Sequence, residues 1–151
     1  MVVVAFGSNI GDRERQIRDA AGKVASFLSN FRLSPIIETA PVGPGTAGQP
    51  AYLNAVGVGE SELSAQELLV RLQAIEQAAG RTRSFPNAPR TLDLDLILSG
   101  DEIVETSSLQ VPHPRFRERR FVLEPLVAVA PDLRDPATGL TMRELRAQLG
   151  D

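Results

Sequence analysis

Two aspartates, Asp93 and Asp95, stand two residues apart inside an apolar run, and Arg90 comes shortly before them. Side chains of a strand alternate between faces, so the two carboxylates share one face and the intervening leucines point to the other. The carboxylates are about 6.6 Å apart along the strand, where two anions repel each other by roughly 2 kcal/mol at an effective dielectric constant of about 20. A hard cation is the simplest compensation, because Mg²⁺ usually takes one or two protein carboxylates together with substrate phosphates.

The same pair also fits an edge strand whose solvent face carries charge to prevent pairing with another chain. Aspartate is uncommon in strands. Here it occurs twice within a run that is apolar enough to be buried on both faces, and this context favours the metal site.

Arginines gather on both sides of the acidic pair. Arg81, Arg83 and Arg90 precede it, and Arg115, Arg117, Arg119 and Arg120 follow His113, the single histidine. The arginine fork suits bidentate contacts with phosphate. A single histidine often only stabilises a turn, but this setting equally indicates a polyphosphate partner, with His113 as a charged contact. Tyr52 and Asn54 share one face of another expected strand, where they could bind a planar heterocycle or simply occupy an exposed face.

Composition limits the classes of function. The 151 residues fit one domain over 1–151, with 42% hydrophobic and 23% charged residues. The net charge of −3 argues against a general nucleic-acid binder. No apolar run reaches the length of a membrane span, and residues 1–7 resemble a first strand more than a signal peptide, so we expect a cytoplasmic protein without membrane contact. The lack of cysteine and the single histidine exclude thiolate and histidine-rich zinc sites.

Apolar periodicity and turn residues predict the elements. We expect strands at 2–6, 31–38, 52–58 and from the aspartate pair to residue 99, a short return strand near 103–104, and helices at 12–28, 64–79, 121–129 and 141–149. Residues 41–50 and 81–91 are expected to be long loops. The order β-α-β-β-α-β is the split βαβ pattern. We therefore predict an α+β, ferredoxin-like sandwich with extra C-terminal helices and a short hairpin.

Paired acids, two arginine clusters and long loops together suit phosphoryl-type transfer, which depends on positioning and charge neutralisation. A metal nuclease, a polymerase-like site or a glycosyltransferase would share the paired acids. A noncatalytic ligand-binding module on the same fold would not need them. No P-loop or Rossmann glycine motif is present, and no side chain is identifiable as a general base.

Several short segments resemble the 6-hydroxymethyl-7,8-dihydropterin pyrophosphokinase family of folate biosynthesis. In that family's order they are Gly7-Ser8-Asn9, 39–43, 52–55, Glu76 with 80–83, 89–98, 111–114 and 119–121. The resemblance covers about residues 1 to 130. It implies transfer of the β,γ-pyrophosphoryl group of ATP to the hydroxymethyl oxygen of the pterin, leaving AMP, by a protein that we expect to be a monomer.

The resemblance also implies roles for individual residues. Asp93 and Asp95 match ligands of two Mg²⁺ ions and, with Arg83 and Arg90, form the expected catalytic set. The expected ATP contacts are Arg81, Arg83, Arg90, His113 and Arg119 at the phosphates and Leu69, Gln73, Leu96 and Leu109 at the adenosine. The expected pterin contacts are Thr39, Val42, Tyr52, Asn54 and Phe121.

The chain departs from better-known members at four places. Pro86-Asn87 stand where others carry Arg-Trp, so the second aromatic wall over the pterin is not assigned. Ser108 replaces a basic residue, and Ala40 and Pro114 replace a proline and a tyrosine. These changes concern substrate affinity and loop behaviour more than the type of reaction.

Overall fold

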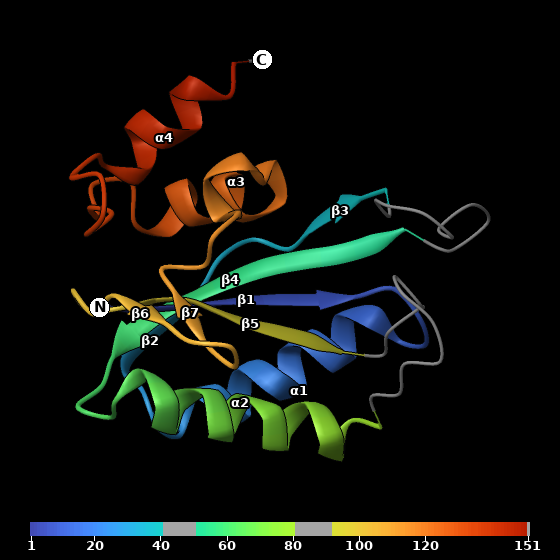
Figure 1. Ribbon diagram of the computed structural model, residues 1–151. Helices are drawn as coiled ribbons and strands as arrows, with labels where there is room; N and C mark the ends of the chain where they lie inside the picture. The colour runs from blue at the N-terminus through green and yellow to red at the C-terminus, as the bar shows by residue number, and fades with distance from the viewer. Residues whose placement is uncertain (41–50, 81–91, 151) are drawn as a thin grey trace.

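An antiparallel sheet forms the middle layer of the computed structural model, which describes residues 1–40, 51–80 and 92–150 (Figure 1). Its central strand β1 (Val2–Ser8) pairs with β4 (Tyr52–Glu60) on one side and with β5 (Asp93–Ser99) on the other. Strands β2 (Ser29–Leu33) and β3 (Ile37–Thr39) both pair with the far edge of β4. The strand order β2-β4-β1-β5 is that of the predicted split βαβ fold, so this prediction is confirmed.

Helices α1 (Arg13–Ala25) and α2 (Ala65–Ala78) cover one face of the sheet (Figure 1). Ile17 and Val24 of α1 and Leu68 and Leu72 of α2 are buried against the strands, at the helical spacing visible in the sequence. A capping box starts α2, whose helix was expected from residue 64: the Ser64 side chain accepts from the N–H of Glu67, whose carboxylate accepts from the Ser64 N–H.

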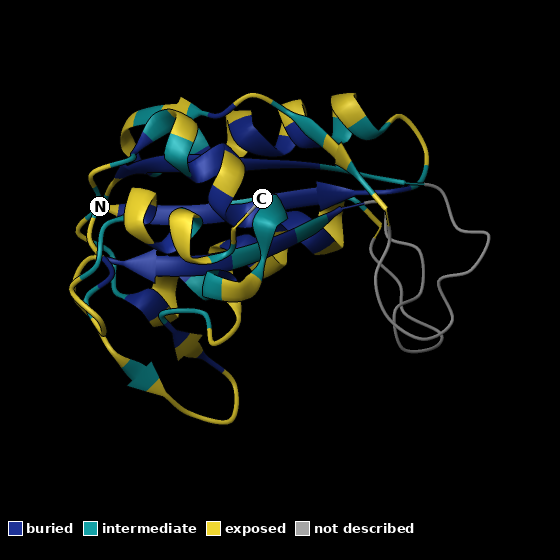
Figure 2. Ribbon diagram, turned by 90° about the horizontal axis from the view of Figure 1, so that it is seen from above, coloured by how far each residue is buried: buried dark blue, intermediate teal, exposed yellow. Residues whose placement is uncertain are grey.

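Helix α3 (Arg120–Val129) covers the opposite face, and helix α4 (Met142–Gln148) packs against α3 (Figure 1). Val3 and Val56 of the sheet pack there against Leu123 and Leu126 of α3 and Met142 of α4. The central strands therefore lie between two helical layers, and Figure 2 shows them buried along most of their length. This burial on both faces explains why the first strand is a continuous valine run.

One predicted strand, 31–38, is wrong as a single element, because the structure divides it into β2 and β3. Pro35 has no N–H to donate to a ladder. Just before it, the backbone N–H of Ser34 donates to the Val56 carbonyl at 2.8 Å, while the Ser34 hydroxyl accepts from the Val56 N–H at 2.8 Å. A side chain thus takes over one ladder bond at this break between the two strands.

The remaining elements are short. Strand β6 (Val104–Glu105) corresponds to the short strand expected near 103–104, and it forms a hairpin with β7 (Gln110–Val111), which was not predicted. A 3₁₀ turn, η1 (Phe116–Glu118), leads into α3. Within the described ranges, no helix combines the length and the apolar character needed to cross a bilayer.

Candidate functional site

A row of three residues crosses the sheet at the end of β1. Gly7 of β1 is paired with Asn54 of β4 on one side and with Asp93 of β5 on the other. The neighbouring residue Phe6 points into the core under α1 and α2. Because side chains alternate, Asn54 and Asp93 face the opposite side of the sheet, on which α3 lies. The register therefore brings a predicted pterin contact and a predicted metal ligand onto one face.

Gly7, the middle residue of this row, has no side chain, so its backbone is uncovered on this face of the sheet. A Cβ atom at this position would lie 3.3 Å from Asn54 Oδ1 and 3.5 Å from Tyr52 Cδ1. Neighbouring strands are spaced by about 4.8 Å, so the Cα atoms of Asn54 and Asp93 are about 10 Å apart across the glycine backbone. This leaves a narrow strip of bare backbone between an amide and a carboxylate.

Strand β5 presents Asp93 and Asp95 on the α3 side, while Leu94 between them is buried on the other side. Glu76 of α2 is almost fully buried, and its carboxylate accepts a hydrogen bond from the backbone N–H of Leu94 at 2.7 Å. This bond ties α2 to the outer edge of β5 at the residue between the two aspartates. It fixes the strand segment that carries both acids.

Arg119 approaches the acids from the residue immediately before α3. Its Nη1 lies 4.0 Å from Asp95 Oδ2, and its guanidinium carbon lies 5.5 Å from the centroid of the Phe121 ring. The side chains of Asp95 and Arg119 are both partly exposed, so solvent and ligands can reach them. An arginine and an aromatic ring thus stand together beside the carboxylates.

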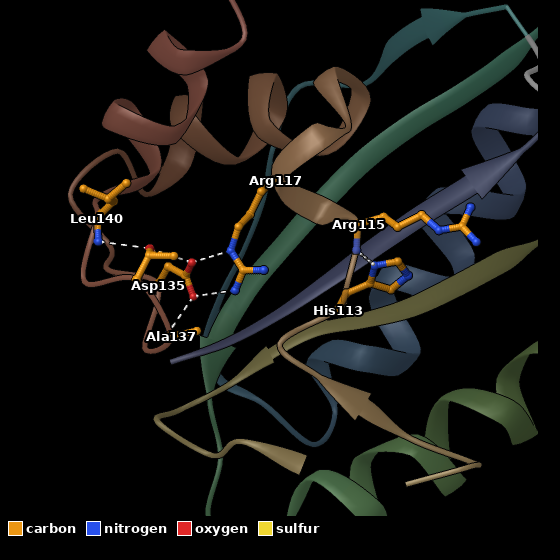
Figure 3. Close-up of polar contacts among 7 residues, drawn as sticks. His113, Arg115, Arg117, Asp135, Ala137 and Leu140 are labelled. Carbon is orange, nitrogen blue, oxygen red and sulfur yellow. Dashed lines mark hydrogen bonds and ion pairs between the residues drawn. The ribbon is translucent and has the colours of Figure 1, made fainter. Parts of the chain in front are cut away.

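His113 also lies near the acids. Its backbone N–H donates to the Ile97 carbonyl of β5 at 2.9 Å, and its Nδ1 accepts from the Arg115 N–H at 3.2 Å (Figure 3). Burial, followed by the positive charges of Arg119 and Arg115, lowers the pKa of His113 from 6.5 to about 4, and the negative charge of Asp93 opposes this only in part. At neutral pH the imidazole is therefore uncharged, and with Nδ1 as acceptor its proton is on Nε2. This is the state of the substrate-free protein, and the expected contact of His113 with phosphate stays a prediction.

This protonation state can be measured directly, because His113 is the single histidine of the chain. In a proton NMR titration of the substrate-free protein we expect the Hε1 signal to have its midpoint near pH 4. The unfolded chain takes up this proton at about pH 6.5, so His113 makes the native state less stable as the pH falls from about 6.5 to 4. In urea the midpoint should return to about 6.5, and a native midpoint that stays there would contradict the neutral donor.

The predicted pterin residues lie close together where the structure describes them. The Asn54 side-chain amide donates to the hydroxyl of Thr39, which joins β4 to β3. Tyr52 lies two residues before Asn54 on the same face of β4, and α3, which carries Phe121, packs over this strand. Val42 lies outside the described residues. Thr39, Tyr52 and Asn54 therefore come together at one end of the sheet, and Phe121 lies on the helix that packs over β4.

The predicted ATP contacts divide into two groups. Leu96 and Leu109 are buried in the core beneath α1 and α2, Leu69 is packed against the same core, and Gln73 of α2 is exposed. They lie along the outer edge of β5, where α2 and β7 contact this strand. His113 and Arg119 are close to the aspartates, whereas Arg81, Arg83 and Arg90 fall outside the described residues.

The donors suit Mg²⁺ better than a metal that requires a full protein cage. Among the described residues, no cluster of three or more histidine, cysteine, aspartate or glutamate side chains forms a metal cage. Mg²⁺ is usually bound by one or two protein carboxylates, while water and substrate phosphate fill its remaining coordination positions. The residues present therefore fit this ion.

Two residues at the site were not predicted as functional. The strand expected at 2–6 continues as β1 to Ser8 and so includes Gly7, whose role depends on its register opposite Asn54 and Asp93. Arg13 of α1 donates to the Ala51 carbonyl at 2.7 Å and lies 3.2 Å from the Glu38 carboxylate of β3. It therefore holds β3 and the start of β4 against α1, and no sequence motif indicated this contact.

Residues 3–131 match the family model described as 7,8-dihydro-6-hydroxymethylpterin-pyrophosphokinase, abbreviated HPPK. The chain belongs to the HPPK family. This match includes both aspartates, the Gly7 row and the His113–Phe121 segment, so the family resemblance seen in the sequence is confirmed. The C-terminal segment with α4 lies beyond the matched residues.

Named relatives agree with this membership. The chain is 43% identical over 138 residues to the 2-amino-4-hydroxy-6-hydroxymethyldihydropteridine pyrophosphokinase of Pseudomonas aeruginosa, covering 89% of this chain and 83% of that protein. It is 38% identical over 142 residues to the folic acid synthesis protein fol1 of Pneumocystis carinii, covering 93% of this chain but only 19% of that much longer protein.

A solved structure titled HPPK-DHPS in complex with substrates superposes with a TM-score of 0.71 at 14% identity, covering 97% of this chain and 43% of the other. At this identity the likeness shows the HPPK fold alone. It agrees with the antiparallel sheet and the helices on its faces.

Proposed function

We infer that this chain is a pyrophosphokinase of folate biosynthesis. It transfers pyrophosphate from ATP to the hydroxymethyl oxygen of 6-hydroxymethyl-7,8-dihydropterin and yields AMP and the pterin diphosphate. Membership in the HPPK family supports the reaction, and the Pseudomonas aeruginosa relative is similar in length. The observation that carries the inference is the row of Asn54, Gly7 and Asp93, which sets a possible heterocycle contact beside a metal ligand.

We assign the metal end to Asp93 and Asp95, which would bind two Mg²⁺ ions together with the phosphates of ATP. Bound Mg²⁺ would neutralise charge on the transferring group and align it with the pterin oxygen. The two carboxylates are held in register by β1 and, through the Leu94 N–H, by Glu76. Their task is to hold the polyphosphate in place, because phosphoryl-type transfer depends mainly on positioning and electrostatics.

We assign the phosphate contacts to Arg119 and His113, with Arg81, Arg83 and Arg90 as further contacts expected from the sequence. The guanidinium of Arg119 lies beside Asp95, where it would meet a metal-bound phosphate. His113, which is uncharged in the substrate-free protein, would donate to a phosphate oxygen through Nε2. In this assignment Leu69 and Gln73 contact the adenosine along the outer edge of β5, and Leu96 and Leu109, whose side chains are buried, contact it through their backbone.

At the pterin end we assign Tyr52 and Asn54 on β4, Thr39 and Val42, and Phe121 as the stacking ring. The amide of Asn54 is oriented by its hydrogen bond to Thr39. An oriented amide can recognise the edge of a planar heterocycle through hydrogen bonds, while an aromatic ring contacts its face. The bare backbone at Gly7 leaves room for the ring between the amide and the metal end.

Analysis of the reaction products tests the assignment. With ATP, Mg²⁺ and the pterin alcohol, we expect mass spectrometry to show AMP and the pterin diphosphate in equal amounts, and EDTA to stop their formation, since the phosphates are bound through the metal. Formation of ADP would contradict pyrophosphate transfer. Substrate binding by calorimetry without any AMP would instead indicate a noncatalytic binding module.

We also propose that the protein acts as a monomer in the cytoplasm without a nucleic-acid partner. The described large apolar side chains that are exposed, Met1, Val70 and Ile103, belong to three separate segments, whereas a specific interface buries about 800 Å² on each partner. The net charge of −3 does not favour nucleic-acid binding. Light scattering of the purified chain distinguishes a monomer from a dimer.

A further inference from the structure

A charged pair lies behind the turn that carries the phosphate contacts. Arg117 of η1 donates through Nε and Nη2 to the two carboxylate oxygens of Asp135, the Nη2 bond being 2.9 Å long (Figure 3). The Asp135 side chain has no exposed surface, and the Arg117 side chain is 26% exposed. A bidentate pair of this kind is strong and fixes the orientation of both side chains.

The Asp135 carboxylate also organises its own loop. It accepts from the Ala137 N–H at 3.0 Å and from the Thr138 hydroxyl at 2.8 Å. Burial on its own raises the pKa of Asp135, but the hydrogen bonds from Arg117, Thr138 and Ala137 outweigh it and hold the pKa below its ordinary value. The residue is therefore a fixed anion, and the loop between α3 and α4 holds it in one place.

Arg117 lies between the two described phosphate contacts in the sequence, four residues after His113 and two before Arg119. Figure 3 shows Arg115 and Arg117 leaving the same turn in different directions, with Arg117 directed to Asp135. The guanidinium of Arg117 also lies over the ring of the fully buried Phe116, 4.7 Å from its centroid. The turn is thus held to the C-terminal loop through Arg117 and to the core through Phe116.

We propose that Asp135 is a positioning residue for ATP, which sets the His113–Arg119 segment against the two aspartates by holding Arg117. The inference rests on the proposed function. Asp135 lies four residues beyond the end of the family match, so the C-terminal segment would contribute to nucleotide affinity. No atom of Asp135 is expected to touch the substrate, because its carboxylate is buried and occupied by Arg117, Ala137 and Thr138.

Loss of the pair should loosen one end of the site. Without the carboxylate, Arg117 no longer fixes η1, and the imidazole of His113 and the guanidinium of Arg119 lose their orientation toward the polyphosphate. The effect should concentrate on ATP, since Tyr52, Asn54 and Thr39 are held by β3 and β4.

The test compares Asp135→Asn with a matched variant, Asp132→Asn. Asp132 lies on the same loop and accepts from Arg143 at 2.9 Å, but it is largely exposed and does not contact η1. For Asp135→Asn we expect the KM for ATP and the calorimetric Kd of Mg-ATP to rise about five- to tenfold, because the lost bidentate pair is charge-assisted. The KM for the pterin and kcat should stay within about twofold of the wild type. Asp132→Asn should behave like the wild type.

Arg117→Lys gives a second test if Asp135→Asn folds poorly, because lysine keeps the charge but loses the fork. It should also raise the Kd of Mg-ATP. If the two residues act as a unit, the Kd of the double variant should be no higher than that of the single variant that binds Mg-ATP more weakly. A lower melting temperature with unchanged Kd for Mg-ATP would overturn the proposal, as would equal losses for ATP and pterin. Calorimetry tests this inference separately from the proposed function, which fails if the wild type forms no AMP.

Discussion

Replacement of Asp95 by asparagine is expected to stop turnover while the protein stays folded. A carboxylate that holds a catalytic metal contributes several kcal/mol to the transition state, so kcat should fall by about 10³-fold or more, since about 1.4 kcal/mol corresponds to tenfold. Asparagine has the shape of aspartate but no charge, and it removes both the repulsion from Asp93 and the attraction to Arg119 at 4.0 Å. The measurement is AMP formation at saturating ATP, pterin and Mg²⁺.

The fold should tolerate this change, because the Asp95 side chain is 39% exposed. Substitutions at such positions usually alter the free energy of unfolding by about 0.5 kcal/mol or less. Asp101→Asn is the matched control: Asp101 follows the opposite end of β5 and is exposed, so activity and melting temperature should both stay at the wild-type value. Normal turnover of Asp95→Asn would remove the metal role, and a large loss of stability would favour a structural role for the acidic pair.

The sequence predicted the elements whose signals are local. The helix expected at 64–79 and the alternation of Asp93 and Asp95 with leucines each depend on residues a few positions apart, and the structure confirms both. The division of 31–38 was missed because it depends on a bond between Ser34 and Val56 on another strand.

Other features of the site arise only in the folded chain. The uncharged state of His113 comes from its burial and from arginines that the turn places around it, and these same arginines made a charged contact plausible in the sequence. Asp135 stands in a segment without a chemical motif, and only the fold brings it to Arg117. Gly7 was visible, but its role depends on the strand register.

Replacement of Gly7 by valine is expected to block the pterin end. Even the Cβ atom would stand 3.3 Å from Asn54 Oδ1 and 3.5 Å from Tyr52 Cδ1, and the two methyl groups beyond it would fill the strip between Asn54 and Asp93. The backbone at Gly7 is not in the left-handed region, and valine is favourable in strands, so the effect comes from space alone. An overpacked site costs about 1–3 kcal/mol, which corresponds to a loss of pterin affinity of about fivefold to a hundredfold.

Calorimetric titration with the pterin, in the presence of Mg²⁺ and a nonhydrolysable ATP analogue, measures this loss. The affinity for the analogue alone should stay within about twofold of the wild type, because the assigned ATP contacts lie on β5 and the segments around it. Gly22→Val is the matched control: Gly22 is exposed on α1, and a Cβ there meets nothing within 4 Å. Because valine is the better helix former of the two, this variant should bind normally and melt no lower than the wild type. Unchanged pterin affinity in Gly7→Val would show that the pterin binds elsewhere and that Asn54 is not part of its site. A selective loss of pterin affinity would establish that the pterin binds over the backbone of Gly7, next to the two aspartates.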